Sequence, residues 1–265
     1  MNHAVHTRSA ITHPRFKPDA SLRLVCFPYA GGGTTIYRAW LDAMPAWIEV
    51  CPVKLPGRED RLFDPPHTNL NQLLAELAVD IEASVPVPFA FFGHSMGAMI
   101  AYELTRLLHR RGRPLPVHLL VSGHRAPQLP DMRPPISHLP DDQFMAQLSR
   151  MNGTPREVAE HDELMRMLLP VLRADFTLCD TYTYVPDVPL ECPISALSGT
   201  DDAIANREKM EPWRKQTSGD FKLHVFAGGH FFLNTLQQLV IETVVKDLVQ
   251  TSDKGAIYAY AWQTA

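Results

Sequence analysis

The segment GHSMG at residues 93–97 carries the clearest chemical signal in the chain. It follows the apolar run 89–92 (FAFF) and opens a helical pattern. At such a strand–turn–helix junction a serine is held in a strained backbone conformation that exposes its hydroxyl, and flanking glycines let strand and helix pass closely. The pattern predicts that Ser95 is a nucleophile; the alternative is a coincidental glycine–serine loop. We expect His94 to pack beneath the turn.

A serine hydroxyl needs a base to take its proton and a carboxylate to orient that base. His230, one of twelve histidines, directly follows the apolar run 221–226 and a glycine pair, at the end of a predicted strand where open α/β sheets place their chemistry. The expected chain order is serine, acid, histidine. Asp201 and Asp202 both follow the run 194–198, and the G-x-x-D spacing favours Asp202, with Asp201 as the alternative.

Two backbone N–H groups should bind the negative charge that develops on the substrate oxygen. One is the N–H of Met96, directly after the nucleophile, and the other is that of Ala30 in the glycine-rich segment 28–33 (PYAGGG). A phosphate-binding loop is the alternative interpretation of this segment. It lacks the lysine and serine of a P-loop and the spacing of a dinucleotide-binding loop, which favours the oxyanion role.

Short runs rich in Val, Ile and Phe alternate with longer helical patterns, which is typical of a parallel sheet covered by crossover helices. The expected strands are 22–27, 48–55, 89–92, 117–122, 194–198 and 221–226, and the expected helices are 70–81 with Thr68 as N-cap, 96–111 and 232–248. Residues 123–193 offer no strand but do show helical patterning. We expect them to form a helical insertion over one edge of the sheet.

A length of 265 residues allows one large domain. We expect a mobile polar N-terminal arm at 1–20, one domain at 21–250 with a lid insertion at about 123–193, and a C-terminal tail at 251–265 with an apolar tip. Five of the ten methionines, Met132, Met145, Met151, Met165 and Met167, fall in the insertion. They either line an adaptable pocket or pack the insertion onto the sheet.

Composition excludes several classes of protein. Twenty-five basic and twenty-nine acidic side chains give a net charge of −4, which argues against a general nucleic-acid binder. No apolar run approaches the ~20 residues of a membrane span, and the first twenty residues do not form a secretory signal. The four cysteines lie far apart without a C-x-x-C pair, which favours reduced thiols, a cytoplasmic location and no zinc site. We therefore expect no metal, no cofactor, no nucleic-acid partner and no membrane partner.

With these residues placed, the chain resembles the type II thioesterases that accompany modular polyketide and nonribosomal peptide synthases. The blocks that carry the resemblance are FPYAGGG at 27–33, LPGRE at 55–59, GHSMG at 93–97, SGHRAP at 122–127, NGTPREV at 152–158, LPVLRADF at 169–176 and GGHFFL at 228–233. The resemblance spans about residues 21–250 and implies an α/β-hydrolase fold, with a mostly parallel sheet, flanking helices and a helical lid. It also implies a triad of Ser95, His230 and Asp202, with Ala30 and Met96 as oxyanion donors.

The resemblance further implies hydrolysis of acyl thioesters on the phosphopantetheine arm of carrier proteins, by way of an acyl-enzyme. In that family the reaction clears stalled or wrongly primed acyl groups. An acylated carrier protein is then the expected partner of a monomeric enzyme. The residues alone indicate a serine hydrolase and do not separate thioester from ester or amide substrates. The alternatives are a general carboxylesterase or lipase of the same fold, and a binding protein that uses the scaffold without chemistry.

Overall fold

The computed structural model describes residues 9–85, 88–151 and 162–253. Within these ranges six strands form one parallel sheet in the order β2-β1-β3-β4-β5-β6. The strands are β1 (Leu22–Phe27), β2 (Ile48–Pro52), β3 (Phe89–His94), β4 (Leu119–Ser122), β5 (Ile194–Gly199) and β6 (Phe221–Phe226). The parallel sheet predicted from the alternating pattern is confirmed, with strand ends that shift by up to three residues.

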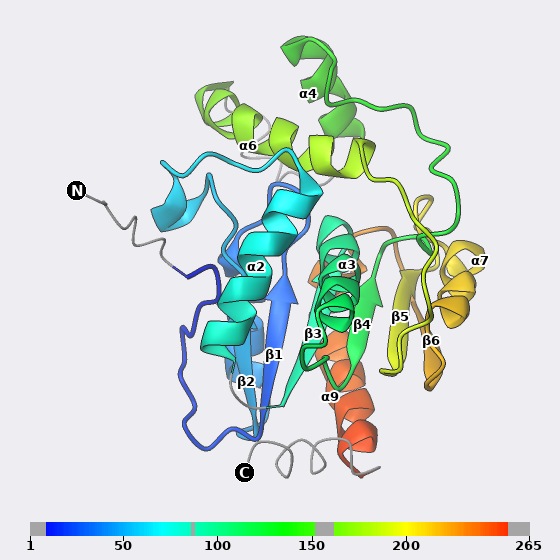
Figure 1. Cartoon of the computed structure of the whole chain (residues 1–265). Helices are drawn as coiled ribbons and strands as arrows, with labels where there is room; N and C mark the ends of the chain where they lie inside the picture. Colours follow the sequence, from blue (N-terminus) through cyan, green and yellow to red (C-terminus); the bar gives the residue numbers. More distant parts are fainter. Residues whose placement is uncertain (1–8, 86–87, 152–161, 254–265) are drawn as a thin grey trace.

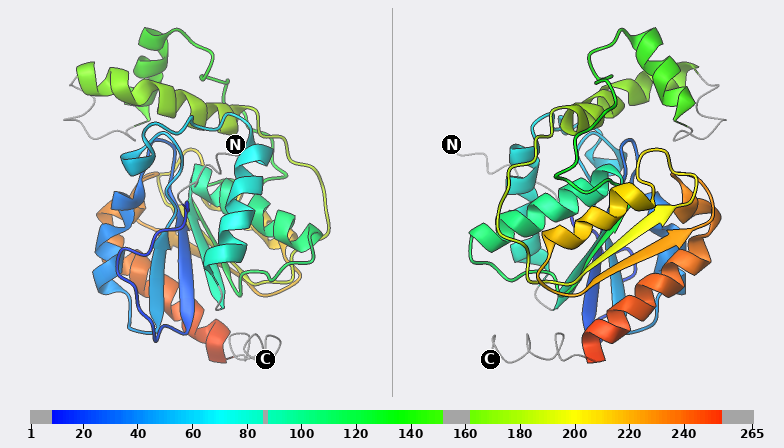
Figure 2. Two further views of the ribbon diagram at one scale, coloured as in Figure 1. Left: turned by 60° about the vertical axis from the view of Figure 1, so that its left-hand side comes forward. Right: turned by 90° about the vertical axis from the view of Figure 1, so that its right-hand side faces the viewer.

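Helices cover both faces of the sheet (Figures 1 and 2). α2 (Leu70–Ser84) and α3 (Met96–Arg110) pack on the face that receives alternate β1 residues such as Val25, while α1 (Arg38–Ala43) and α9 (Gln237–Asp253) cover the face that receives Leu24. Because both faces are buried, the strands read as continuous apolar runs. The remaining elements are α4 (Asp141–Arg150), α6 (Asp162–Asp180), α7 (Arg207–Met210), α8 (Phe232–Thr235), η1 (Thr34–Tyr37), η2 (Glu59–Arg61) and η3 (Glu211–Gln216).

Two helix predictions differ in detail from the structure. α2 begins after Asn69, whose side chain accepts a hydrogen bond of 3.2 Å from the Gln72 backbone N–H, rather than after the predicted cap Thr68. Asparagine and threonine both cap helices, so composition alone could not choose between neighbours. The helix predicted over 232–248 is divided into α8 and α9, because the backbone leaves helical geometry at Leu236.

The predicted insertion forms a lid over the carboxyl ends of the strands (Figures 1 and 2). α4 and α6 pack on each other through a small apolar core of their own. Its buried members are Ile136, Phe144, Leu148, Met165, Leu169 and Leu172. The helices expected within 123–193 are found at 141–150 and 162–180, whereas the block 152–158 lies outside the described residues.

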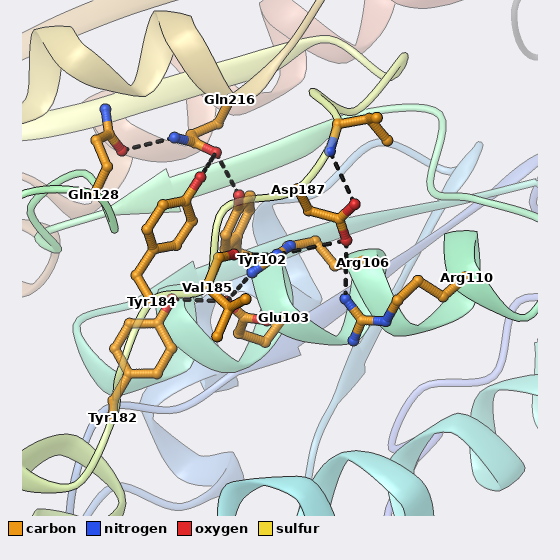
Figure 3. Close-up of polar contacts among 11 residues, drawn as sticks. Tyr102, Glu103, Arg106, Arg110, Gln128, Tyr182, Tyr184, Val185, Asp187 and Gln216 are labelled. Atoms are coloured by element: carbon orange, nitrogen blue, oxygen red, sulfur yellow. Dashed lines mark hydrogen bonds and ion pairs between the residues drawn. The ribbon is translucent and has the colours of Figure 1, made fainter.

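The segment that returns from α6 to β5 is fixed to α3 by charged side chains (Figure 3). The Arg106 guanidinium donates to the Glu103 carboxylate at 2.7 Å and to the backbone carbonyl of Val185 at 2.5 Å. Arg110, one turn further along α3, donates to the Asp187 carboxylate at 3.2 Å. These bonds hold the segment that leads out of the lid, residues 181–193, against α3.

Gln216 bonds to both limbs of the lid, which are the segment that leads into it before α4 and the segment that returns from it after α6 (Figure 3). Its amide nitrogen donates to the side chain of Gln128, on the limb that leads into the lid, at 2.7 Å. Its amide oxygen accepts from the hydroxyls of Tyr102, on α3, at 2.5 Å and of Tyr184, on the returning limb, at 3.2 Å. One buried side chain therefore ties the two limbs to α3.

Residues 9–20 differ from the mobile arm predicted for 1–20, because they lie along the edge strand β2. Ala10 and Ile11 are buried, and Ile11 forms an antiparallel bridge with Val53. Lys17 donates to three backbone carbonyls, including that of Ile48 at 2.9 Å. The apolar pair and this lysine supply the contacts that a purely polar arm would lack.

His13, Glu49 and Cys51 are metal-ligating residue types whose ligand atoms lie within 4.8 Å of one another. His13 Nδ1 is 2.7 Å from Glu49 Oε1, and Arg23 Nε donates to the other oxygen of the same carboxylate at 3.1 Å. Burial, followed by the charge of Glu49, raises the pKa of the Cys51 thiol, which keeps it protonated. In the structure this group joins the N-terminal segment to β1 and β2 through the contacts of Glu49 with His13 and Arg23.

A second buried network holds α9 against the sheet. Asp247 on α9 accepts hydrogen bonds from Ser195 Oγ at 2.6 Å, Lys222 Nζ at 2.6 Å and His224 Nε2 at 2.7 Å. His118 Nε2 lies 2.9 Å from the same Ser195 hydroxyl. Although serine, histidine and aspartate meet here, the Ser195 hydroxyl is fully buried and donates directly to the carboxylate, so the network is structural.

This network makes stability depend on pH. Burial lowers the pKa of His118 to about 4, and Lys222 adds to that effect. Its pKa in the unfolded chain is about 6.5, so between these values the unfolded chain binds a proton that the folded protein does not. The free energy of unfolding is therefore unaffected by His118 protonation above about pH 6.5, and it falls, by at most ~3 kcal/mol, as the pH drops toward 4.

His118→Gln disturbs the ring contacts with Thr251 and Ser195, so we expect a lower free energy of unfolding at neutral pH. Because glutamine does not titrate, the fall in that free energy between about pH 6.5 and 4 should also become flatter. Urea denaturation of both proteins at several pH values measures the difference between their two curves. Curves that stay parallel between about pH 6.5 and 4 would contradict the assignment to His118.

Candidate active site

The sheet register brings the predicted site residues to one edge. From β1 the chain continues to β2 on one side and then to β3 on the other, so β1 and β3 flank a topological switch point, where open α/β sheets bind ligands. Phe27 pairs with Gly93, so the glycine-rich segment and the turn at Ser95 begin at the same level. Gly199 pairs with Phe226, which brings the two loops after β5 and β6 together.

Ser95 occupies the sharp turn between β3 and α3. Its φ of 54° and ψ of −118° lie in a region that non-glycine residues rarely adopt, and within the described residues only Glu59 also combines a side chain with a positive φ. A Cβ on Gly93 would overlap the backbone of Gly97, and one on Gly97 would overlap the carbonyl of Phe27. The strand–turn–helix geometry predicted from GHSMG is confirmed, including the need for both glycines.

His230 Nδ1 lies 2.8 Å from Asp202 Oδ2. The other oxygen of this buried carboxylate accepts the backbone N–H groups of Ile204 at 2.8 Å and Ala205 at 3.0 Å. Because an ionised carboxylate only accepts hydrogen bonds, we place the proton of the neutral imidazole on Nδ1. Nε2 is then the unprotonated nitrogen that can act as a base.

The surroundings of Asp202 favour the ionised carboxylate. Burial alone would raise its pKa, but the hydrogen bond and charge of His230, together with the N–H groups of Ala205 and Ile204, bring the pKa below the ordinary value. Its neighbour Asp201 is exposed and accepts from the Thr200 hydroxyl at 3.1 Å. Of the two candidate carboxylates, the structure therefore brings Asp202 to the histidine.

His94 lies beneath the turn, as expected. It is fully buried, its Nδ1 is 2.8 Å from the Ser122 hydroxyl, and its ring centroid is 5.0 Å from that of His230. Burial, followed by the neighbouring His230, holds its pKa well below the ordinary value. His94 therefore remains neutral and supports the turn and the second imidazole by packing.

Ser95, His230, Ala30 and Met96 all line one cavity between the sheet edge and the lid. Met96 is the first residue of α3, where backbone N–H groups lack partners within the helix. The lid supplies the apolar wall of the cavity, formed by Ile136, Leu148, Met151, Leu172 and Phe176. Arg125, Asp131, Arg133 and Asp180 add a charged region to the lining.

The lid methionines divide between the two roles considered for them. Met151 lines the cavity, Met165 is buried in the lid core and Met145 packs against that core. Met132 and Met167 are largely exposed. Three of the five, Met145, Met151 and Met165, thus pack in or against the lid core, and of the five only Met151 also forms part of the described cavity wall.

A buried ion pair that was not predicted from the sequence lies behind the glycine-rich segment. Arg58 Nη2 donates to Asp175 Oδ1 at 2.8 Å, and both side chains are buried. These residues lie in the blocks LPGRE at 55–59 and LPVLRADF at 169–176. The available signal was an acidic residue within the apolar pattern of α6.

Residues 22–248 match the thioesterase domain family. The chain belongs to the thioesterase family. This thioesterase is a serine hydrolase of the α/β-hydrolase fold that acts on thioesters, and the resemblance to type II thioesterases is confirmed. No helix in the described part of the chain has the length and apolar character required to cross a membrane.

Three relatives illustrate the match. The gramicidin S biosynthesis protein GrsT of Aneurinibacillus migulanus is 45% identical over 229 residues, covering 86% of this thioesterase and 90% of the relative. The RedJ thioesterase from the prodiginine pathway of Streptomyces coelicolor superposes with a TM-score of 0.80 at 39% identity, covering 85% and 89% of the two chains. The type II thioesterase BorB from the borrelidin biosynthetic cluster gives a TM-score of 0.83 at 36% identity, covering 91% and 98%.

Proposed function

We propose that this thioesterase removes stalled or aberrant acyl groups from the phosphopantetheine arm of carrier proteins in polyketide or nonribosomal peptide biosynthesis. The relatives from the gramicidin S, prodiginine and borrelidin systems support this role. The observation that carries the chemistry is the bond between His230 and Asp202 on a cavity that Ser95 also lines. In this proposal residues 21–250 form one catalytic domain with its lid at about 123–193, and the enzyme acts as a cytoplasmic monomer.

In the first half of the reaction the Ser95 hydroxyl oxygen attacks the thioester carbonyl carbon, and His230 Nε2 takes the hydroxyl proton. The N–H groups of Ala30 and Met96 bind the oxyanion, while Asp202 holds the ring and stabilises the imidazolium. The C–S bond then breaks. The pantetheine thiolate leaves, takes the proton from His230 and departs as the thiol, so that an acyl-serine ester remains.

In the second half, water adds to the ester carbonyl while His230 Nε2 takes a proton from it. The bond between the acyl carbon and Ser95 Oγ breaks, and the serine oxygen regains that proton from the imidazolium. The free acid departs and the enzyme returns to its starting state. Throughout, the apolar lid residues around Leu172 and Phe176 offer a surface for the acyl chain.

A general esterase of the same fold is the second candidate, and turnover of matched substrates separates the two. We expect kcat/KM for an acylated carrier protein to exceed that for the oxoester of the same acyl group by about tenfold or more, the factor that ~1.4 kcal/mol of extra transition-state binding gives. The N-acetylcysteamine thioester, which keeps the bond and removes the carrier, should fall between them. Equal or faster turnover of the oxoester would identify a general esterase.

A further inference from the structure

We infer that Asp175 on the lid helix α6, together with Arg58, positions the turn that carries Ala30. The direction of the Ala30 N–H toward the oxyanion then depends on where α6 packs against this turn. This inference rests on the proposed role of Ala30. Neither Asp175 nor Arg58 lines the cavity that holds Ser95 and His230. Both therefore act through the backbone of the turn rather than on the substrate.

The turn itself is tight and specific. The Gly32 N–H donates to the carbonyl of Tyr29 at 2.8 Å, which closes a β-turn over four residues. Gly31, its third residue, has a φ of 75°, the value that a type II turn requires and glycine supplies. Tyr29 C=O and Ala30 N–H belong to one planar peptide unit, so the bond that holds this carbonyl also directs the Ala30 N–H.

Asp175 binds the next peptide unit. Its Oδ2 accepts the Gly31 N–H at 2.7 Å, across 144 residues of sequence. In a type II turn this central peptide can flip toward the type I arrangement, and a flip would turn the Ala30 carbonyl oxygen toward the carboxylate. Repulsion between the two oxygens opposes that flip, and so does the loss of a charge-assisted bond in a buried site.

Arg58 completes the ring of contacts. Its Nη2 donates to Asp175 Oδ1 at 2.8 Å, and its Nη1 donates to the carbonyl of Gly32 at 2.7 Å. One ion pair, whose members are both more than nine-tenths buried, therefore holds the central peptide group of the turn through the Gly31 N–H and the peptide group that directly follows the turn through the Gly32 carbonyl. In the same way the next residue, Glu59, accepts from the backbone N–H of Thr34 at 2.7 Å, just beyond the glycines.

Packing ties the ion pair to the lid. Leu172 and Asp175 stand three residues apart on one face of α6, and both contact Gly31. A Cβ on Gly31 would lie only 2.5 Å from Leu172 Cδ2, and one on Gly57 would lie 2.9 Å from Val171 Cγ2. α6 thus packs against the chain at Gly31 and Gly57. This packing places the Asp175 carboxylate beside the turn and Leu172 in the apolar wall of the cavity.

The test uses the full-length protein with Asp175→Asn, Arg58→Lys and the double variant. Asp141→Asn is the matched control. Asp141, on α4, pairs at 2.6 Å with Arg173, which lies on α6 as Asp175 does, but Asp141 is exposed and does not line the cavity. The substrate is an acyl-pantetheine thioester. Two inhibitors share its acyl group: a trifluoromethyl ketone, which forms a tetrahedral adduct with the serine, and a thioether, which has no carbonyl to attack.

For Asp175→Asn we expect kcat to fall about 10²-fold, the cost of misplacing an oxyanion donor, with KM within about threefold of the original value. Affinity for the trifluoromethyl ketone should fall by the same factor as kcat/KM, and affinity for the thioether should stay within about threefold. Because the two side chains act as one unit, the double variant should be little worse than Asp175→Asn. The control should match the unaltered enzyme.

A purely structural pair gives a different outcome. If Asp175→Asn lowers the melting temperature while the folded enzyme keeps its kcat and its ketone affinity, or if both inhibitors weaken equally, the inference is wrong. Arg58→Lys, which keeps the charge, guards against a variant that fails to fold. Failure of the proposed function is distinct, since the unaltered enzyme would then lack thioester hydrolysis or would retain it without Ser95.

Discussion

Replacing Ser95 with alanine should abolish acyl-thioester hydrolysis, with kcat falling by about 10⁶-fold, the scale of effect seen when the serine of a catalytic triad is removed. Alanine keeps a Cβ and so strains the backbone at a φ of 54° to a similar extent, which leaves the turn and the fold intact. The nucleophile alone is lost. Release of thiol from an acyl-pantetheine thioester measures the effect, and circular dichroism checks the fold.

The matched control is Ser149→Ala on the lid. The exposed Ser149 hydroxyl donates to the backbone carbonyl of Met145 within α4. It should leave turnover unchanged. A fluorophosphonate probe should label the unaltered enzyme and the control but not the Ser95 variant. Turnover close to that of the unaltered enzyme in Ser95→Ala would exclude this serine as the nucleophile.

Asp202→Asn should lower kcat by about 10⁴-fold, since an amide cannot stabilise the imidazolium and favours the wrong tautomer of the ring. The variant keeps the size of the side chain, and Ile204 and Ala205 can still donate to its oxygen. Asp201→Asn is the neighbouring control and should change kcat by less than about threefold, because that carboxylate is exposed and bonds only within its loop. Steady-state kinetics on one thioester compares the two.

The opposite ranking would assign the acid to Asp201. If both variants kept full activity, neither aspartate would support His230, and the triad as proposed would be wrong. A stability measurement on each variant separates a loss of chemistry from a loss of folded protein.

The sheet and the candidate site residues could be inferred from the sequence because each depends on local signals. In a parallel sheet every strand ends at the same edge, so a serine, an aspartate and a histidine that each follow a buried run meet without knowledge of the intervening chain. The glycines around Ser95 add a second local constraint, since their closeness to neighbouring backbone forbids a Cβ. For these features the sequence needs no long-range information.

Features that depend on contacts between distant segments could not be predicted in the same way. The bond from Asp175 to the backbone of Gly31 spans 144 residues and leaves no periodic trace in the sequence. The packing of Ala10 and Ile11 against β2 is similar, because two apolar residues in a polar stretch form no pattern. The choice of Asn69 over Thr68 as helix cap depends on backbone geometry that either residue accepts.

The N-terminal segment has a consequence for how the molecule behaves at high concentration. β2 lies at one border of the sheet, and an uncovered border strand is a template on which a second molecule can add its own strand and start a fibril. Here the backbone N–H of Thr12 donates to Pro52 and that of Lys54 donates to Ala10, while a lysine ammonium takes the carbonyl of Ile48. The N-terminal segment thus occupies hydrogen-bonding positions at both ends of β2, which leaves less of this border free for strand addition.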